Sequence, residues 1–212
     1  MSFRYFCIGL MVLACGQVWA DEVALVMSVQ GRVWRSADAL PVPVEAFIKL
    51  KDGDRLGLEK DARLRLVYFE NGRQETWSGP GRLELTPREG KAGGLPAAEV
   101  KLLPLVMARQ IARTPALDGQ GRGGVTRLRA IPGQDAVTKL EDTYRDLRSR
   151  TGRDDLGPEM YLLSGLFEAR ELDRVDKVLG DLQQEQSKNP EAALLVSLYR
   201  KAVRNARESK NQ

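Results

Sequence analysis

The residues that most enzymes use for nucleophilic or metal chemistry are scarce in this chain. It contains no histidine, and its two cysteines, Cys7 and Cys15, both precede residue 20. Without histidine, a serine or cysteine nucleophile lacks its usual base, and the commonest zinc and copper ligand is missing. We therefore predict a non-catalytic protein with no catalytic residue, no metal and no cofactor. A glycan-cleaving carboxylate pair stays open as a third interpretation, because the separation of two carboxylates is invisible in sequence.

Two short motifs resemble ligand-binding loops. The segment Gly119–Gly124 fits the dinucleotide pattern G-x-G-x-x-G, which functions when a strand precedes it and a helix follows it. Here a proline-containing link precedes the motif and a β-like segment follows, which favours a flexible loop. Asp52 and Asp54 flank Gly53, but a calcium loop needs more oxygen donors at set spacings. We interpret this pair as a solvated turn.

Positive charge is concentrated between residues 100 and 132. Asp118 is the acidic residue of that span, whereas its basic residues are Lys101, Arg109, Arg113, Arg122, Arg127 and Arg129. Such a face suits anionic envelope polymers, lipid headgroups or an acidic partner. The alternative is a solvated edge that discourages aggregation between sheets. If this segment binds, the contact positions that we predict are Arg122, Arg127 and Arg129.

The first twenty residues are typical of an export signal. Arg4 supplies a positive charge, an apolar run follows from Tyr5 through Ala14, and small residues at Val18 and Ala20 suit cleavage before Asp21. Export predicts a periplasmic protein whose mature form has no thiol and no disulfide. A minority interpretation is that Cys15 belongs to a lipobox and would be acylated, which would anchor a lipoprotein to a membrane.

The overall charge and hydropathy add two expectations. The chain holds 33 basic and 29 acidic residues, a net charge of +4, and loss of the leader removes Arg4 to leave +3. This mild excess does not indicate a nucleic-acid partner. Beyond the leader, no stretch approaches the length of uncharged apolar residues that crosses a bilayer, so we expect no transmembrane segment in the mature chain.

The segment from 47 to 85 has the alternation of a small antiparallel β module. The residues of 62–69 that face one side are Ala62, Leu64, Leu66 and Tyr68. Asn71-Gly72 predicts a two-residue type I′ turn into a return strand at 73–77. With that turn, Leu66 lies opposite Trp77, and the indole joins the buried face. Trp34 and Trp77 are also able to stack on sugars, but buried sheet positions are the favoured interpretation.

Other strands are expected on both sides of this module, at residues 24–29, 32–34, 55–58, 82–85, 99–103 and 125–131. Prolines make residues 36–45 a loop or an edge, and residues 86–96 a turn or flexible connection. Pro104 favours a short helix through Ile111. Together these predict an antiparallel β sandwich or barrel over residues 21–132.

After Pro132-Gly133 the spacing of apolar residues changes from two to three or four, which predicts a second, helical domain over residues 133–205. Four helices are expected, with short links that favour antiparallel neighbours. Pro158 suits the start of the second helix and Asn189-Pro190 the start of the fourth. A polar tail at 206–212 is expected to fray. The fold class predicted for the whole chain is α+β.

The β module resembles a known family. Val29–Val33, Leu50–Leu56, Ala62–Leu66 and Asn71-Gly72 are similar in order and spacing to the FecR-like domain of bacterial periplasmic proteins. The resemblance covers about residues 23–85. It implies a β domain that works by interaction; in the name-giving members, it passes a signal from an outer-membrane transporter to a cytoplasmic sigma factor. The helices from Gly157 to Pro190 faintly resemble a tetratricopeptide unit.

The functional expectation is a non-catalytic periplasmic adaptor or sensor that binds another cell-envelope component through its FecR-like domain. The alternative is a structural protein that binds peptidoglycan or anionic lipid surfaces through the basic segment. The two differ in salt dependence, because binding to a charged surface weakens steeply as ionic strength rises.

Overall fold

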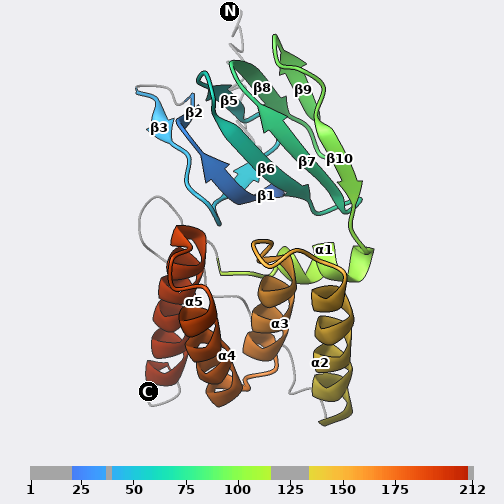
Figure 1. The fold of residues 1–212 in the computed structure, drawn as a ribbon, viewed down its shortest axis with the longest axis vertical. Coiled ribbons are helices and arrows are strands. Elements are labelled where there is room, and N and C mark those ends of the chain that lie inside the picture. Colours follow the sequence, from blue (N-terminus) through green and yellow to red (C-terminus); the bar gives the residue numbers. More distant parts are fainter. Residues whose placement is uncertain (1–20, 37–39, 116–133, 210–212) are drawn as a thin grey trace, which may run out of the picture.

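The computed structural model describes residues 21–36, 40–115 and 134–209, and its fold is α+β, as predicted (Figure 1). Strands make up the first part and helices the C-terminal part. Several predictions lie outside the described residues: the leader with Cys7 and Cys15, the glycine motif 119–124, the strand at 125–131, and the contact positions Arg122, Arg127 and Arg129.

The strands form two antiparallel sheets of five strands each. The first sheet has the order β10 (Glu99–Leu102), β7 (Arg73–Ser78), β6 (Arg63–Tyr68), β1 (Glu22–Gln30), β4 (Lys49–Lys51). The second sheet has the order β3 (Val42–Pro43), β2 (Val33–Arg35), β5 (Arg55–Leu58), β8 (Gly81–Leu85), β9 (Gly90–Gly93). Of the two architectures left open by the sequence, a closed barrel is not formed by the described strands.

One apolar core lies between the two sheets. The first sheet contributes alternate residues of β6 and the indole of Trp77, and the second sheet contributes leucines of β5 and β8; the largest members are Leu64, Leu66, Tyr68, Trp77, Leu56, Leu83 and Leu85. Burying a leucine or an aromatic side chain contributes about 2 kcal/mol. The inward face that alternation predicts for residues 62–68 is therefore confirmed, and so is the burial of Trp77.

The register of the β6–β7 hairpin differs from the prediction by two residues. Leu64, rather than Leu66, lies opposite Trp77, and Leu66 lies opposite Glu75. Because side chains alternate along a strand, a slip of two residues leaves each of them on its original face. The predicted core residues of this hairpin are therefore correct, although the predicted register is wrong.

The error arises in the turn, where the type I′ prediction at Asn71-Gly72 is wrong. Tyr68 and Arg73 are the innermost pair implied by the register, so four residues connect the strands. The N–H of Gly72 donates to the carbonyl of Tyr68 at 3.1 Å, and Gly72 has a φ of 69°. Asn71 does not share that left-handed conformation; its Oδ1 instead accepts from the N–H of Arg73 at 3.0 Å.

One strand was not predicted, because it is rich in glycine. Residues 86–96, expected as a turn or flexible connection, contain the edge strand β9, in which Ala92 pairs with Leu83 of β8. A side chain at Gly90 would have its Cβ 2.6 Å from the Leu83 side chain, so glycine allows this edge to approach the core. At the opposite edge of the same sheet, the short strand β3 contains Pro43, as expected for residues 36–45.

Five helices are described: α1 (Leu105–Ile111), α2 (Gln134–Ser149), α3 (Gly157–Glu168), α4 (Leu172–Glu185) and α5 (Pro190–Glu208). The predicted helix starts are confirmed. Asn189 caps α5 through its Oδ1, which accepts from the N–H groups of Glu191 and Ala192 at 3.0 and 3.3 Å. α5 continues through Glu208, three residues into the tail expected to fray. Within the described residues, no helix combines the length and apolar character needed to cross a bilayer.

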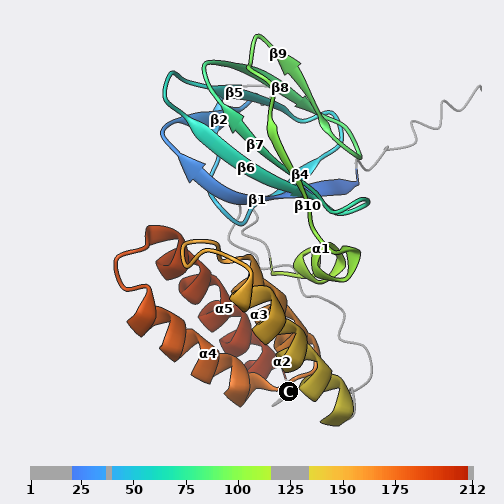
Figure 2. The same ribbon diagram turned by 45° about the vertical axis from the view of Figure 1, so that its right-hand side comes forward.

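A second apolar core joins the first sheet to the helices. It includes Leu25, Met27 and Val67 from the outer face of that sheet, three residues of α1, and the inner sides of α2–α5. Figure 2 shows α1 between the sheets and the helices. Phe47 belongs to this core and is fully buried with a φ of 64°, a conformation rare for a bulky residue. Because the core is continuous, the two parts form one packed body.

Candidate functional site

The basic segment is only partly described. Lys101 of β10 and Arg109 of α1 are exposed. Arg113 is paired with Glu168 of α3, with 2.5 Å between Nη1 and Oε2. Arg113 thus helps to attach α1 to α3. Since Arg122, Arg127 and Arg129 lie outside the described residues, their role as contacts stays a prediction.

The side chain of Asp54 stabilises the turn at Gly53. The Oδ2 of Asp54 accepts from the N–H of Lys51 at 2.8 Å, and it lies 3.5 Å from Nη1 of Arg35. Gly53 has a φ of 80°, which glycine adopts without strain. The described residues contain no cluster of three or more acidic side chains arranged to hold a metal.

The sheets enclose one buried carboxylate, Glu75 on β7, which is fully shielded from solvent. Its Oε1 lies 2.5 Å from Nε of Arg73, and its Oε2 accepts from the indole N–H of Trp77 and the backbone N–H of Gly90, both at 3.0 Å. Burial raises the pKa of Tyr68, and the neighbouring charge of Glu75 raises it further. The carboxylate is fully engaged, so it fastens the sheets together.

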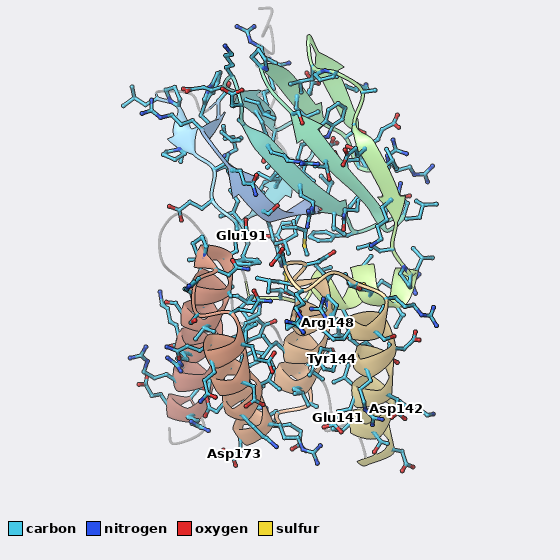
Figure 3. The ribbon with its side chains drawn as sticks, viewed as in Figure 1. Glu141, Asp142, Tyr144, Arg148, Asp173 and Glu191 are labelled. Carbon is cyan, nitrogen blue, oxygen red and sulfur yellow. The ribbon has the colours of Figure 1, made fainter. Side chains whose placement is uncertain are left out.

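A second buried carboxylate, Glu159 of α3, fastens the helices. Both of its oxygens lie 2.9 Å from Nη1 of Arg148, and the Tyr144 hydroxyl donates to Oε1 at 3.2 Å. Figure 3 labels Tyr144 and Arg148 between α2 and α3. The same guanidinium donates to the carbonyl oxygens of Thr151 and Asp155 at 3.1 and 3.0 Å. Burial and the charge of Glu159 raise the pKa of Tyr144 to about 12.

Sequence reasoning missed both buried carboxylates. For Glu75 a signal was present, because residues 73, 75 and 77 share a strand face and Trp77 was expected inside. Glu159 immediately precedes Met160, which was placed on the buried side of its helix, but nothing in the spacing identified Arg148 as its partner.

A cleft of about 1140 Å³ separates the sheets from the α4–α5 turn. Arg65 of β6 and Glu191 of α5 both line it, and Figure 3 labels Glu191 at the end of α5 nearest the sheets. Burial raises the pKa of Glu191, whereas the backbone of Val29 and the charge of Arg65 act in the opposite direction. Nε of Arg65 is buried and has no hydrogen-bond partner among the described residues.

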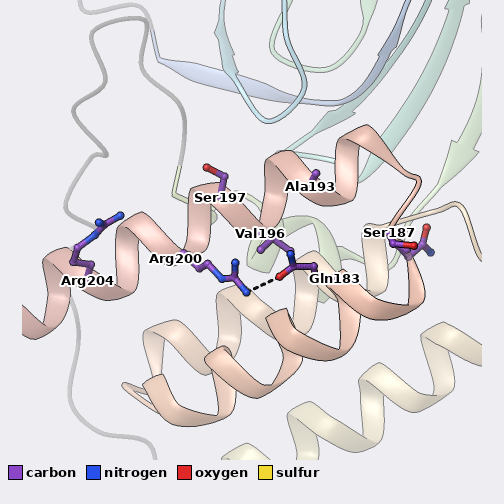
Figure 4. Close-up of a pocket in the computed structure, with 8 residues that line it drawn as sticks. Gln183, Ser187, Ala193, Val196, Ser197, Arg200 and Arg204 are labelled. Atoms are coloured by element: carbon purple, nitrogen blue, oxygen red, sulfur yellow. Dashed lines mark hydrogen bonds between the residues drawn. The ribbon is translucent and has the colours of Figure 1, made fainter.

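A smaller groove of about 420 Å³ runs between α4 and α5 (Figure 4). Its lining is mostly polar, and Arg200 of α5 donates to the side-chain oxygen of Gln183 of α4 at 2.7 Å. This bond joins neighbouring helices across the groove. Nothing along it combines an apolar floor with converging polar groups, the features typical of a ligand site.

The most distinctive exposed feature is an apolar strip along β10 and the start of α1, which we call the edge patch. Its members and their exposed fractions are Val100 (46%), Leu102 (72%), Leu105 (47%) and Val106 (57%). Figures 1 and 2 show β10 at the margin of the first sheet, continuing into α1. Among the described strands, β10 pairs with β7 alone, so its other side presents backbone donors and acceptors.

Comparisons of this chain with protein-family models, with curated proteins and with solved structures found no match.

Proposed function

We propose that this protein is a non-catalytic adaptor or sensor of the bacterial periplasm that binds another cell-envelope protein along the edge patch of a FecR-like β domain. The observation that carries the proposal is β10, a sheet edge whose apolar side chains are exposed. Glu99 and Lys101 give one side of β10 the charge with which proteins usually protect such edges, whereas Val100 and Leu102 leave its other side apolar and exposed. An uncovered apolar edge is typical of a surface that receives a partner.

The partner chemistry that fits is an extended, apolar protein segment. A strand added antiparallel to β10 would satisfy the outward N–H and C=O groups of that strand. Val100 and Leu102 are two residues apart and share one side of the strand, so alternate apolar residues of the segment would meet them. Leu105 and Val106 extend the apolar contact onto α1.

The interior supports an adaptor rather than an enzyme. The two buried carboxylates, Glu75 and Glu159, are each held by an arginine and by further donors, as structural groups are. The continuous core across α1 favours a rigid body that holds the edge patch at a constant position relative to the helices.

The FecR-like assignment has two supports in the strand arrangement. Gly31 and Gly53, both within the segments that carry the resemblance, have left-handed φ values of 71° and 80° at turns between strands. In such positions a side chain is strained, so the spacing of these glycines follows from the fold.

Co-purification of the protein with its periplasmic partner tests the proposal. Leu102→Asp places a charge in the apolar contact, so the partner should be lost while the melting temperature changes little. Leu40→Asp is the matched control, since Leu40 is also exposed (75%) but lies beside β3. Retention of the partner by Leu102→Asp would overturn the proposal.

The second candidate function is binding to peptidoglycan or an anionic lipid surface through the basic segment. Its support among the described residues is the exposure of Lys101 and Arg109, beside the edge patch. Apolar docking should tolerate physiological salt, whereas binding through these cations should weaken steeply between low and physiological ionic strength. A steep salt dependence would therefore favour the second candidate function.

A further inference from the structure

The outer face of the second sheet carries a groove that lies apart from the edge patch. It has a volume of about 630 Å³ and is lined by residues of β2, β5, β8 and β9, the strands that Figure 1 shows side by side. The strand register sets one row of neighbours across this face: Trp34, Gly57, Arg82 and Gly93. Two of these positions, Gly57 and Gly93, are glycines, so space is left above the sheet there.

The indole of Trp34 forms the floor of the groove. A Cβ built on Gly57 would lie 2.1, 2.2 and 2.7 Å from Cζ2, Cε2 and Cη2 of that indole. Three ring atoms at such similar distances place the six-membered ring face-on over Gly57. One face of the ring therefore covers the sheet, and the opposite face is available to the groove that Trp34 lines.

Charged side chains surround this aromatic floor. Arg55, Arg82 and Lys91 line the groove together with the single carboxylate of Glu84. Arg55 is paired with Glu84, with 3.2 Å between Nε and Oε2. In the described parts of the chain, neither Arg82 nor Lys91 has an ion-pair partner, so the groove has two uncompensated positive charges beside a flat apolar ring.

We propose that this groove binds a carboxylate-bearing glycan strand. A sugar ring presents a face of C–H groups that packs on an indole, as apolar groups pack on aromatic faces. Arg82 and Lys91 would pair with carboxylates of the strand, and Glu84 would accept from sugar hydroxyls. The volume lies in the usual range for small-ligand sites, and an acidic strand complements the positive rim.

The test uses a galacturonic acid oligomer as the probe and the matching neutral galactose oligomer as its comparison. With the chain that starts at Asp21, which lacks Trp19, binding is followed by the change in tryptophan fluorescence. We attribute that change to Trp34, since Trp77 is buried and hydrogen-bonded. We expect saturable binding of the acidic oligomer, with an affinity at least about tenfold higher than for the neutral one, because the neutral oligomer has no carboxylate to pair with Arg82 and Lys91.

Three variants locate the site, with binding followed by calorimetry where tryptophan is removed. Trp34→Ala should weaken binding about tenfold or more, and Arg82→Gln should weaken it and reduce its salt dependence. Gly57→Ala should also weaken binding, because the added methyl group has no room beneath the Trp34 ring and would displace that ring. Arg88→Gln is the matched control; Arg88 is exposed and paired with Glu70, and its loss should leave binding unchanged.

Unchanged affinity in both Trp34→Ala and Gly57→Ala would overturn the proposal, and so would the absence of binding by the acidic oligomer. Equal or tighter binding of polyphosphate would overturn it too, because it would show attraction to any polyanion. Leu102→Asp should bind the oligomer normally, so failure of this site and failure of the edge patch are distinguishable.

Discussion

Oε2 of Glu75 accepts a 3.0 Å hydrogen bond from the backbone N–H of Gly90, so one buried carboxylate connects β7 of the first sheet to β9 of the second. Glu75→Ala removes this acceptor and leaves Arg73 and the Trp77 N–H without their partner. Because the Trp77 indole is shielded from water, although Arg73 is partly exposed, we expect the free energy of unfolding to fall by about 3 kcal/mol in urea titrations.

Two variants serve as comparisons for Glu75. Glu75→Gln keeps one oxygen acceptor and should cost less than Glu75→Ala. Glu84→Ala removes a carboxylate from the solvent side of β8, where its pair with Arg55 is exposed, and should change stability by less than about 1 kcal/mol. Equal losses in Glu75→Ala and Glu84→Ala would contradict a fastening role for Glu75.

The Arg148–Glu159 pair should be the main polar determinant of helix packing. Arg148→Ala leaves the carboxylate of Glu159, with a side chain only 8% exposed, without its cation. It also frees the carbonyl oxygens of Thr151, Gly152 and Asp155. We expect a loss of about 3 kcal/mol in the free energy of unfolding. Arg148→Lys should rescue little, because a single ammonium cannot reach all of these acceptors in the geometry of a guanidinium.

Arg145→Ala is the control on the same helix. Arg145 pairs with Asp142 at 2.7 Å, but both side chains are more than half exposed. Exposed pairs contribute little, so this variant should unfold almost as the wild type does. A loss in Arg145→Ala as large as in Arg148→Ala would mean that general charge, rather than burial of the pair, stabilises the helices.

Glu191 should make stability depend on pH. Burial raises its pKa, so the folded chain holds this proton more tightly than the unfolded chain. Protonated Glu191 therefore adds to the free energy of unfolding below the ordinary carboxyl pKa of about 4. This stabilisation is lost as pH rises through the higher pKa of the folded chain. Glu191→Gln should be more stable than the wild type near neutral pH, by an amount that shrinks on acidification.

Unfolding curves recorded at acidic and neutral pH measure this difference. Glu45→Gln is the control, because Glu45 lines the same cleft but is exposed. If Glu191→Gln is instead the less stable protein at neutral pH, then attraction by Arg65 and by the N-terminus of α5 outweighs burial.

Alternation and helix-start signals predicted most element positions because both are local. The inward residues of β6 and the start of α5 at Asn189-Pro190 followed from spacing alone. The hairpin register was wrong because Asn71-Gly72 fits a tight turn locally, although the chain uses a wider one. β9 was missed because its glycines carry no apolar pattern, and its stability derives from pairing with β8.

The candidate site depended on information that local patterns do not contain. Val100 and Leu102 are apolar and alternate, as residues of a buried strand do. Residues 99–103 were expected to form a strand, and β10 covers residues 99–102. Their exposure follows from the order of strands, which places β10 at the margin of the sheet beside β7. Strand order is set by long-range packing, so the apolar residues of β10 could not be recognised as a surface beforehand.

The most direct test of docking at the edge patch is photo-crosslinking in living cells, with a photoreactive residue in place of Leu102 or, as the control, Leu40. These side chains are similarly exposed, at 72% and 75%. We predict a discrete covalent adduct with one envelope protein from position 102, through an extended segment of that protein, and none from position 40. No adduct from position 102, or the same adduct from both positions, would contradict the account.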